Sequence, residues 1–162
     1  MAIRFNADEI FEMAEEIEAN ASKFYKQAAY NTKDEEIKAM LLDLSEMENE
    51  HLNIFRDMRK EIGEEEKSET VYDPDDEGML YLQSMADSHG WEGQMSKTEK
   101  LTGNEPIQDV LKSAIRAEKD SVVFYAGLKS LVSARAGAGK VDKIIKEELS
   151  HITKLSQKLR SL

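Results

Sequence analysis

Apolar residues recur every three or four positions along four long segments of the chain, which is the pattern of a helix with one buried face. The predicted helices cover about residues 6–30, 34–65, 105–133 and 140–161. The first has a capping box at its start, since Asn6 is followed three positions later by Glu9. Pro106 falls in the first turn of the third helix, where proline is well tolerated. The pattern predicts an all-α protein.

Two short breaks and one long stretch separate the predicted helices. Residues 31–34 and 134–139 interrupt the helical pattern, so each break joins two antiparallel helices into an αα-hairpin. About forty residues, 66–104, lie between the hairpins, and a crossover along the bundle explains this length better than a structureless loop. A short helix is expected within it, over about residues 77–87. The whole chain, 1–162, is predicted to form one four-helix-bundle domain.

The second half of the chain repeats a few residues of the first at an offset of one hundred positions. Residues 1–62 placed over 101–162 keep only these six identities: Ala14, Glu18, Phe24, Tyr25, Glu48 and His51. That number is close to chance, but Glu and His are residue types that bind metals and carry acid–base chemistry. The Glu-x-x-His pair at 48–51 returns at 148–151, and the upstream Glu18 returns as Glu118. The repeat therefore marks a candidate metal site.

Helical spacing makes each Glu-x-x-His pair one chelating unit. Residues three apart on a helix differ by about 60° in angle and about 4.5 Å in height, so both side chains can reach one ion. The pairs lie on predicted buried faces, where a carboxylate needs a counter-charge or a metal. The two pairs and the two upstream glutamates give six predicted metal ligands: Glu18, Glu48, His51, Glu118, Glu148 and His151.

The positions of the turns place these ligands at one level of the bundle. In an antiparallel hairpin, residues equidistant from the turn lie side by side. Glu18 and Glu48 have their midpoint at position 33, inside the first break, and Glu118 and Glu148 have theirs at 133, just before the second. Four carboxylates and two imidazoles would then surround two metal ions, and this donor set suits iron, manganese or zinc.

Two glutamates beside the predicted ligands do not follow the repeat. Glu50 and Glu147 adjoin ligand positions, but their counterparts are Ser150 and Met47. Only glutamates present in both halves are therefore predicted to bind the ions.

Tyr25 and Tyr125 lie two helical turns after Glu18 and Glu118. Because helical side chains lean toward the N-terminus, their hydroxyls either hydrogen-bond a ligand carboxylate or find another buried partner. In the crossover, His89 is expected to be exposed and not a ligand, and Trp91 is expected to hold the crossover against the bundle.

Composition narrows the functional classes. The 162 residues include no cysteine, which excludes disulfides and thiolate metal sites within them. The net charge of −11 argues against nucleic acid as a partner; it suits cation binding, and it also keeps an abundant protein soluble. No apolar run approaches the length of a membrane span, and the N-terminus lacks an apolar signal stretch. A soluble cytoplasmic protein with no membrane partner is expected.

With those residues in place, the chain resembles the rubrerythrin branch of the ferritin-like superfamily. In the first half, the resemblance lies in Ala14-Glu15-Glu16-Ile17-Glu18 through Phe24-Tyr25 and in Leu44-Ser45-Glu46-Met47-Glu48-Asn49-Glu50-His51. In the second half, it lies in Ala114 to Asp120, Phe124-Tyr125 and Ile144 to Ile152. The resemblance implies a ferritin-like fold and a non-haem di-iron centre. Glu48 and Glu148 would bridge the ions, Glu18 and Glu118 would be terminal ligands, and His51 and His151 would each bind one iron.

The chain departs from rubrerythrins in two ways. Rubrerythrins end in a rubredoxin-like domain with four cysteines, and this chain has none, so a separate electron-donor protein is expected. Rubrerythrins also carry an extra glutamate one turn after the third-helix ligand, where this chain has Ser121. A plainer site of four glutamates and two histidines is therefore expected.

The leading functional hypothesis is an oxidoreductase. A homodimer would reduce hydrogen peroxide or dioxygen at the two irons, with no catalytic residue beyond the metal ligands. Three alternatives stay open at this point: ferroxidase and iron handling of the bacterioferritin type, a structural or sensory bundle that binds zinc or manganese, and a bundle without metal.

Overall fold

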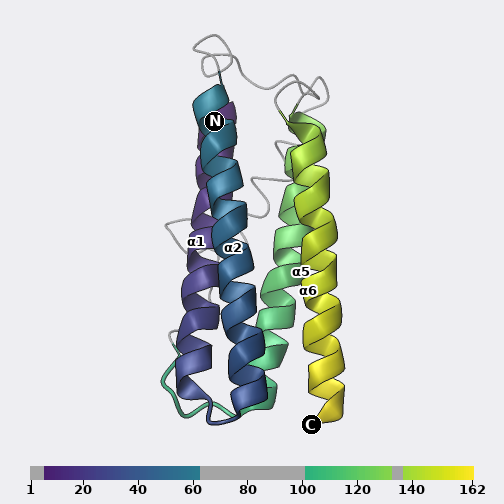
Figure 1. The fold of residues 1–162 in the computed structure, drawn as a ribbon. Helices are drawn as coiled ribbons and strands as arrows, with labels where there is room; N and C mark the ends of the chain where they lie inside the picture. Colours follow the sequence, from purple (N-terminus) through teal and green to yellow (C-terminus); the bar gives the residue numbers. More distant parts are fainter. Residues whose placement is uncertain (1–5, 63–100, 133–136) are drawn as a thin grey trace, which may run out of the picture.

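The computed structural model describes residues 6–62, 101–132 and 137–162. These residues form the helices α1 (Ala7–Asn31), α2 (Glu35–Glu61), α5 (Ile107–Leu131) and α6 (Ala138–Ser161). The helices pack as two antiparallel hairpins, α1 with α2 and α5 with α6, which lie side by side (Figure 1). The predicted all-α four-helix bundle is confirmed. The predicted short helix over 77–87, His89 and Trp91 lie outside the described residues.

Side chains satisfy free backbone amides where the first hairpin begins and where it turns. The predicted capping box is present, with the Glu9 amide donating to Asn6 Oδ1 and the Asn6 amide donating to Glu9 Oε2, each at 2.9 Å. At the turn, the Asp34 carboxylate accepts from the amides of Glu36 and Ile37. Such caps stabilise a helix by about 1 kcal/mol each, and they fix where α1 and α2 start.

Several predicted helix ends differ from the structure by two to four residues. The second helix ends at Glu61 rather than near 65, because Ile62 is extended (φ −67°, ψ 121°) and buried. A glycine follows it in the sequence, which is the residue type most common just after a helix. The fourth helix begins at Ala138 rather than 140, after Gly137 in the left-handed region (φ 107°). A Cβ on Gly137 would lie 2.7 Å from Met58 Cε.

The third helix starts after Pro106 rather than including it. Pro106 is the N-cap, with an extended ψ of 139°, and Ile107 is the first helical residue. A residue that precedes proline disfavours the helical region, so Glu105 stays outside the helix. Its carboxylate instead accepts from the Thr102 amide at 2.6 Å and the Gly103 amide at 3.0 Å.

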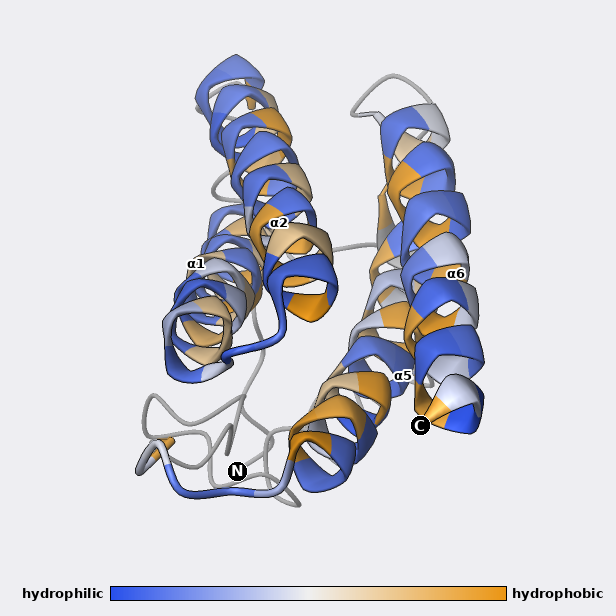
Figure 2. Cartoon of the chain, turned by 60° about the horizontal axis from the view of Figure 1, so that its bottom comes forward, coloured by the Kyte–Doolittle hydropathy of each residue, from blue (hydrophilic) through white to orange (hydrophobic). Residues whose placement is uncertain are grey.

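Two apolar clusters fill the bundle on either side of its middle. Hydrophobic residues line the sides of the helices that face one another, and hydrophilic residues cover the outside (Figure 2). One cluster joins the start of α1 and the end of α2 to α5 and α6, with Phe11, Phe55, Met58, Leu128 and Ile144 among its members. The other joins the opposite ends, with Phe24, Ile37, Leu41, Leu111 and Leu155 among its members. The polar site lies between these two clusters.

None of the helices in the described part of the chain combines the length and the apolar character needed to cross a lipid bilayer.

Candidate dimetal site

The structure brings all six predicted ligands together near the middle of the four helices. Each helix supplies one glutamate, and α2 and α6 each add the histidine three residues later. All six residues are buried, with exposed fractions between 0% and 4%. The two imidazole rings stack, with their centroids 5.8 Å apart and their planes inclined by 20°. The matching positions along the helices thus become one compact group in space.

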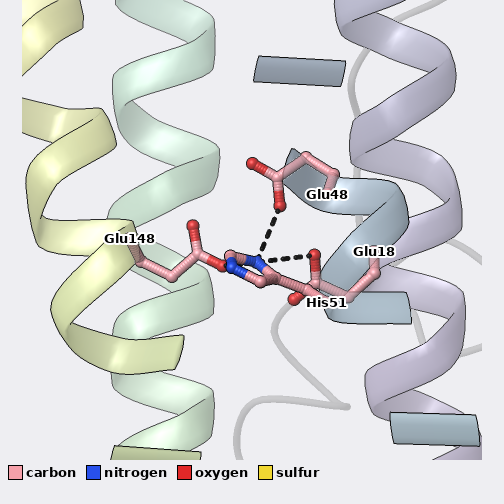
Figure 3. A group of neighbouring side chains, drawn as sticks. All are labelled: Glu18, Glu48, His51 and Glu148. Atoms are coloured by element: carbon pink, nitrogen blue, oxygen red, sulfur yellow. Dashed lines mark ion pairs between the residues drawn. The ribbon is translucent and has the colours of Figure 1, made fainter. Parts of the chain in front are cut away.

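Glu48 and Glu148 each contact both imidazoles. Glu48 Oε1 lies 3.0 Å from His151 Nδ1, and Glu48 Oε2 lies 3.4 Å from His51 Nδ1. Glu148 mirrors it, with Oε1 at 3.0 Å from His51 Nδ1 and Oε2 at 2.9 Å from His151 Nδ1. Figure 3 shows both carboxylates turned toward His51. Each of these carboxylates can therefore serve two ions at once.

Glu18 and Glu118 lie at opposite sides of this pair. Glu18 Oε2 is 3.6 Å from His51 Nδ1, and Glu118 Oε1 is 3.6 Å from His151 Nδ1. Two groups of donors result, and within each group the ligand atoms lie within 4.8 Å of one another. One group holds Glu18 and His51, the other holds Glu118 and His151, and both include Glu48 and Glu148.

Residues 9–120 match the sequence model of the rubrerythrin family. This chain belongs to the rubrerythrin family. Its fold is also similar to a crystal structure described as a candidate ferritin-like diiron-carboxylate protein from Thermotoga maritima, with a TM-score of 0.72 and 26% sequence identity. That similarity covers 97% of this chain and 96% of the other. No curated protein matches the sequence.

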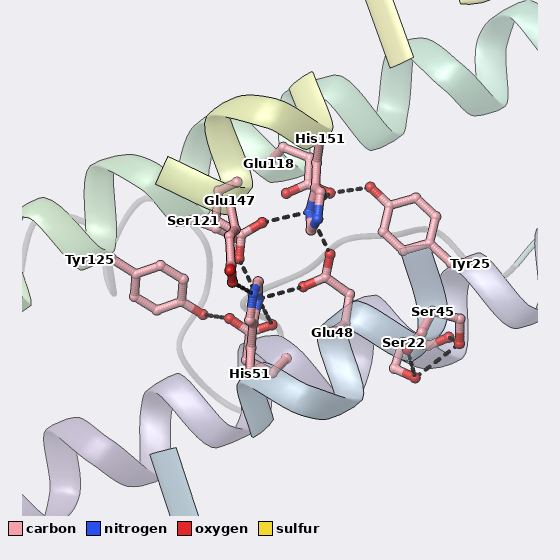
Figure 4. A network of polar contacts seen from close by, with 12 residues as sticks. Ser22, Tyr25, Ser45, Glu48, His51, Glu118, Ser121, Tyr125, Glu147 and His151 are labelled. Atoms are coloured by element: carbon pink, nitrogen blue, oxygen red, sulfur yellow. Dashed lines mark hydrogen bonds and ion pairs between the residues drawn. The ribbon is translucent and has the colours of Figure 1, made fainter. Parts of the chain in front are cut away.

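In this rubrerythrin-family bundle, two buried tyrosines cross from one hairpin to the other. The Tyr25 hydroxyl donates to Glu118 Oε1 (Figure 4), and the Tyr125 hydroxyl donates to Glu18 Oε1. Of the two interpretations left open from the sequence, the structure shows the hydrogen bond to a carboxylate of the six-residue group. In each case the carboxylate belongs to the opposite hairpin. The sequence had suggested the glutamate two turns earlier on the tyrosine's own helix.

Ser121 occupies the position of the extra glutamate of rubrerythrins. Its hydroxyl donates to the backbone carbonyl of Ala117 at 3.1 Å, within its own helix. The two groups of ligand atoms described above come from four glutamates and two histidines, and the Ser121 hydroxyl is bonded within its own helix.

Buried atoms without hydrogen bonds test whether these residues fit metal ions. Within the described part of the chain, Glu48 Oε1, both Glu148 oxygens and the two histidine Nδ1 atoms have no hydrogen-bond partner. Buried polar atoms are rarely left in this state. Carboxylate oxygens and imidazole nitrogens that face one another at close range are instead the donors that iron, manganese and zinc accept. The residues fit a pair of divalent ions.

Burial and repulsion from neighbouring carboxylates favour protonation of Glu18 and Glu118 when no ion is bound. Desolvation, with Glu48 nearby, raises the pKa of Glu18 well above its usual value. Desolvation also raises the pKa of Glu118 to about 7. Protons on these groups relieve part of the buried negative charge, and divalent ions would take over that role when they bind.

The carboxylates in turn favour charged histidines. Burial alone would lower the pKa of His151, but the nearby carboxylates of Glu118, Glu148 and Glu48 raise it to about 12. The pKa of His51 is also raised, because the effect of the nearby Glu148, Glu18 and Glu48 carboxylates outweighs that of burial. Metal binding would therefore displace protons from both rings.

Sequence reasoning missed one residue of the site, Glu147. Its Oε2 lies 2.8 Å from His51 Nε2, on the side of the ring away from the shared carboxylates (Figure 4). The repeat excluded Glu147 because Met47 is its counterpart. The available signal was its place directly before Glu148 on the helix that faces His51, but that signal depends on how the two hairpins pack.

Proposed function

We propose that this protein is a non-haem di-iron oxidoreductase that reduces hydrogen peroxide or dioxygen with electrons from an external donor. The observation that carries the proposal is the position of Glu48 and Glu148, each of which places one oxygen near each imidazole Nδ1. This arrangement supports two ions that share two carboxylates, with Glu18 and Glu118 as the terminal ligands.

Iron is the metal that the family and the donor set favour together. The donors are oxygen and nitrogen only, which also suits manganese and zinc. The resemblance to a structure described as a candidate diiron-carboxylate protein supports iron among them. A bound pair of ferrous ions would supply two electrons, which together with two protons would convert one hydrogen peroxide into two waters.

The protein's own contribution is a rigid, dry and acidic pocket. The two apolar clusters exclude bulk water from both ends of the site, which strengthens the electrostatic interactions inside it. The hydroxyls of Tyr25 and Tyr125 hold the carboxylates of Glu118 and Glu18 in place. A fixed set of ligands keeps both ions at the geometry that the small oxidant must meet.

The electrons would come from outside these 162 residues. The chain has no cysteine, so it holds no thiolate iron site of the rubredoxin type. A separate donor protein or domain would therefore reduce the ions again after each turnover. A reducing compartment such as the cytoplasm fits this requirement.

Anaerobic loading with Fe²⁺ tests the proposal. We expect two ions per chain, and we expect hydrogen peroxide to oxidise the loaded protein much faster than dioxygen does, as followed by stopped-flow absorbance. Glu50→Gln is the control, because Glu50 is an exposed glutamate two residues after Glu48. Equal or negligible rates with the two oxidants would count against a peroxide-reducing enzyme.

Assembly size distinguishes the oxidoreductase from iron storage. A protein that sequesters iron as a mineral needs a shell of many subunits, whereas we expect a homodimer. Size-exclusion chromatography with light scattering makes this measurement. A shell-sized particle that retains many irons per chain would favour the storage function.

A further inference from the structure

His51 and His151 occupy equivalent positions in the repeat, but the structure gives only one of them a partner for its outer ring nitrogen. His51 Nε2 lies 2.8 Å from Glu147 Oε2. His151 Nε2 is buried and has no hydrogen-bond partner among residues 6–62, 101–132 and 137–162. The two rings are therefore held differently, although their Nδ1 atoms face the same two carboxylates.

Glu147 reaches His51 from the opposite hairpin. It lies in α6, directly before Glu148, and its side chain is 34% exposed, so it stands at the edge between the buried site and solvent. Its other oxygen lies 3.8 Å from Lys143 Nζ, one turn earlier on the same helix. These two contacts favour one orientation of the carboxylate, with Oε2 toward the ring.

The contact with Glu147 also determines which nitrogen of His51 is available to an ion. When Nε2–H donates to Glu147, the lone pair of a neutral ring is on Nδ1. That Nδ1 atom lies 3.0 Å from Glu148 and 3.4 Å from Glu48. A carboxylate on the outer nitrogen of a ligand histidine fixes both the tautomer and the direction of the ring. His51 is thus oriented before an ion arrives.

The α1–α2 hairpin offers no matching group to His151. Met47 stands directly before Glu48, where the repeat would need a glutamate, and a thioether is only a weak acceptor. Among the residues that the structure describes, His151 Nε2 finds no hydrogen-bond partner, which is energetically unfavourable for a buried nitrogen.

We propose that Glu147 is a positioning residue that makes the two ion positions unequal. The position beside Glu18 and His51 binds a divalent ion more tightly than the position beside Glu118 and His151 does. It therefore fills first. This inference rests on the dimetal site of the proposed function, but it does not depend on the redox reaction. Loss of an outer carboxylate partner changes metal affinity by about 10- to 100-fold in comparable sites, which is the difference expected here.

Titration with Co²⁺ measures metal binding directly, because the visible absorption of the ion changes when protein ligands bind it. Variants of the two terminal glutamates then separate the two ion positions. Glu118→Gln weakens one terminal position and leaves the Glu18–His51 position, while Glu18→Gln does the reverse. With Glu147 present, we expect the Glu118→Gln protein to bind its first Co²⁺ about 10- to 100-fold more tightly than the Glu18→Gln protein. Equal affinities of these two variants would overturn the inference.

Substitutions at Glu147 and at its counterpart Met47 test whether Glu147 causes the difference in affinity. In a Glu147→Met background, the affinities of the Glu18→Gln and Glu118→Gln proteins should converge. Glu147→Gln keeps an acceptor for Nε2–H and should retain part of the difference. Met47→Glu should raise the affinity of the His151 position. Glu50→Met is the matched control, because it also replaces a glutamate beside a ligand, and it should leave the difference unchanged.

The outcomes separate this inference from the proposed function. Fewer than two Co²⁺ per wild-type chain would overturn the dimetal site itself, and the inference with it. Two Co²⁺ per chain, with a difference that persists unchanged in Glu147→Met, would overturn the inference alone. Circular dichroism of each variant shows whether the bundle has folded, and Met47→Glu gives an independent result if Glu147→Met does not fold.

Discussion

Hydroxyl groups hold the α1–α2 hairpin together beside the site, whereas the α5–α6 hairpin has apolar residues at the same positions of the repeat. Ser45 Oγ donates to the Ser22 carbonyl at 2.8 Å, and Ser22 Oγ lies 3.0 Å from the Ser45 carbonyl. The counterparts are Val122 and Ile145. The hairpins therefore share the glutamates and histidines of the six-residue group but not this pair of serines. The two helices of each hairpin are thus held together by different side chains at these positions.

The largest expected effect comes from a shared carboxylate. Glu148→Gln should reduce the bound metal from two ions to at most one, because Glu148 faces both imidazoles and an amide is a poor substitute for a bridging carboxylate. Glu18→Gln should keep one ion, since Glu18 lies beside His51 alone. Metal analysis after gel filtration measures the stoichiometry. Two tightly bound ions in Glu148→Gln would contradict the shared role.

The pH dependence of stability should distinguish protein stripped of metal from loaded protein. Burial raises the pKa of Glu118 from 4.5 to about 7, so the folded state holds this proton more tightly than the unfolded state does. Its contribution to stability is full below pH 4.5 and is lost as the pH rises toward 7, on the order of 3 kcal/mol. Urea unfolding in the presence of a chelator measures this loss.

Other titratable groups also affect the pH dependence of the free energy of unfolding. The raised pKa of His151, about 12, contributes stability below pH 6.5 that is lost only at higher pH, so it does not cancel the effect of Glu118. The pKa of Glu18 is also raised by burial, so the contribution of Glu18 to stability is lost over the same range, and Glu118→Gln should remove only part of the loss between pH 4.5 and 7. Loaded protein should instead gain stability over this range, because metal binding releases protons. A stripped protein that becomes more stable from pH 4.5 to 7 would refute the assignment.

The crossed tyrosines should produce crossed effects. Tyr25→Phe removes the donor to Glu118 and should weaken the ion position beside His151, while Tyr125→Phe removes the donor to Glu18 and should weaken the position beside His51. We expect losses of about 10- to 100-fold in metal affinity. Competition with a chromogenic chelator, in the Glu18→Gln and Glu118→Gln proteins, shows which position is affected. Effects confined to the tyrosine's own hairpin would be inconsistent with the structure.

The smallest effect is expected at the serine contact. Ser45→Ala removes the hydrogen bonds of the Ser45 hydroxyl with the Ser22 hydroxyl and carbonyl but leaves the bond from the Ser22 hydroxyl to the Ser45 carbonyl. It should reduce the free energy of unfolding by about 1 kcal/mol. Metal stoichiometry should stay at the wild-type value, because neither serine belongs to the six-residue group. Thermal unfolding and metal analysis of the same preparation test both statements, and a loss of bound metal would show that packing and ligation are coupled.

Much of the fold and of the site could be predicted from the sequence, because two patterns coincide: the helical spacing of apolar residues and the repeat between the two halves of the chain. The helical repeat of apolar residues identified the four helices, and the offset of one hundred selected Glu18, Glu48 and His51 with their counterparts. The family match to residues 9–120 confirms the resemblance to rubrerythrins. The six residues do lie together, although their assignment as metal ligands stays a prediction.

The remaining details depend on contacts between segments far apart in the chain. The partner of Tyr25 is Glu118, and that of His51 Nε2 is Glu147; both pairs cross between hairpins, whose relative rotation helical spacing does not specify. Comparison of the two halves also hides any residue that only one half possesses, which is why Glu147 was missed. The error at Ile62 arose because an apolar residue continued the pattern although the backbone had left the helix.

The crossed tyrosine bonds carry a consequence for the origin of this architecture. Each hairpin gives its hydroxyl to the other and takes one in return, so the pattern has two-fold symmetry. Two copies of a single ancestral hairpin would satisfy it equally well. After duplication and fusion of such a hairpin, the two halves could diverge wherever a residue has no symmetric partner in the other hairpin. Four of the six shared residues, Glu18, Tyr25, Glu48 and His51, do have such a partner.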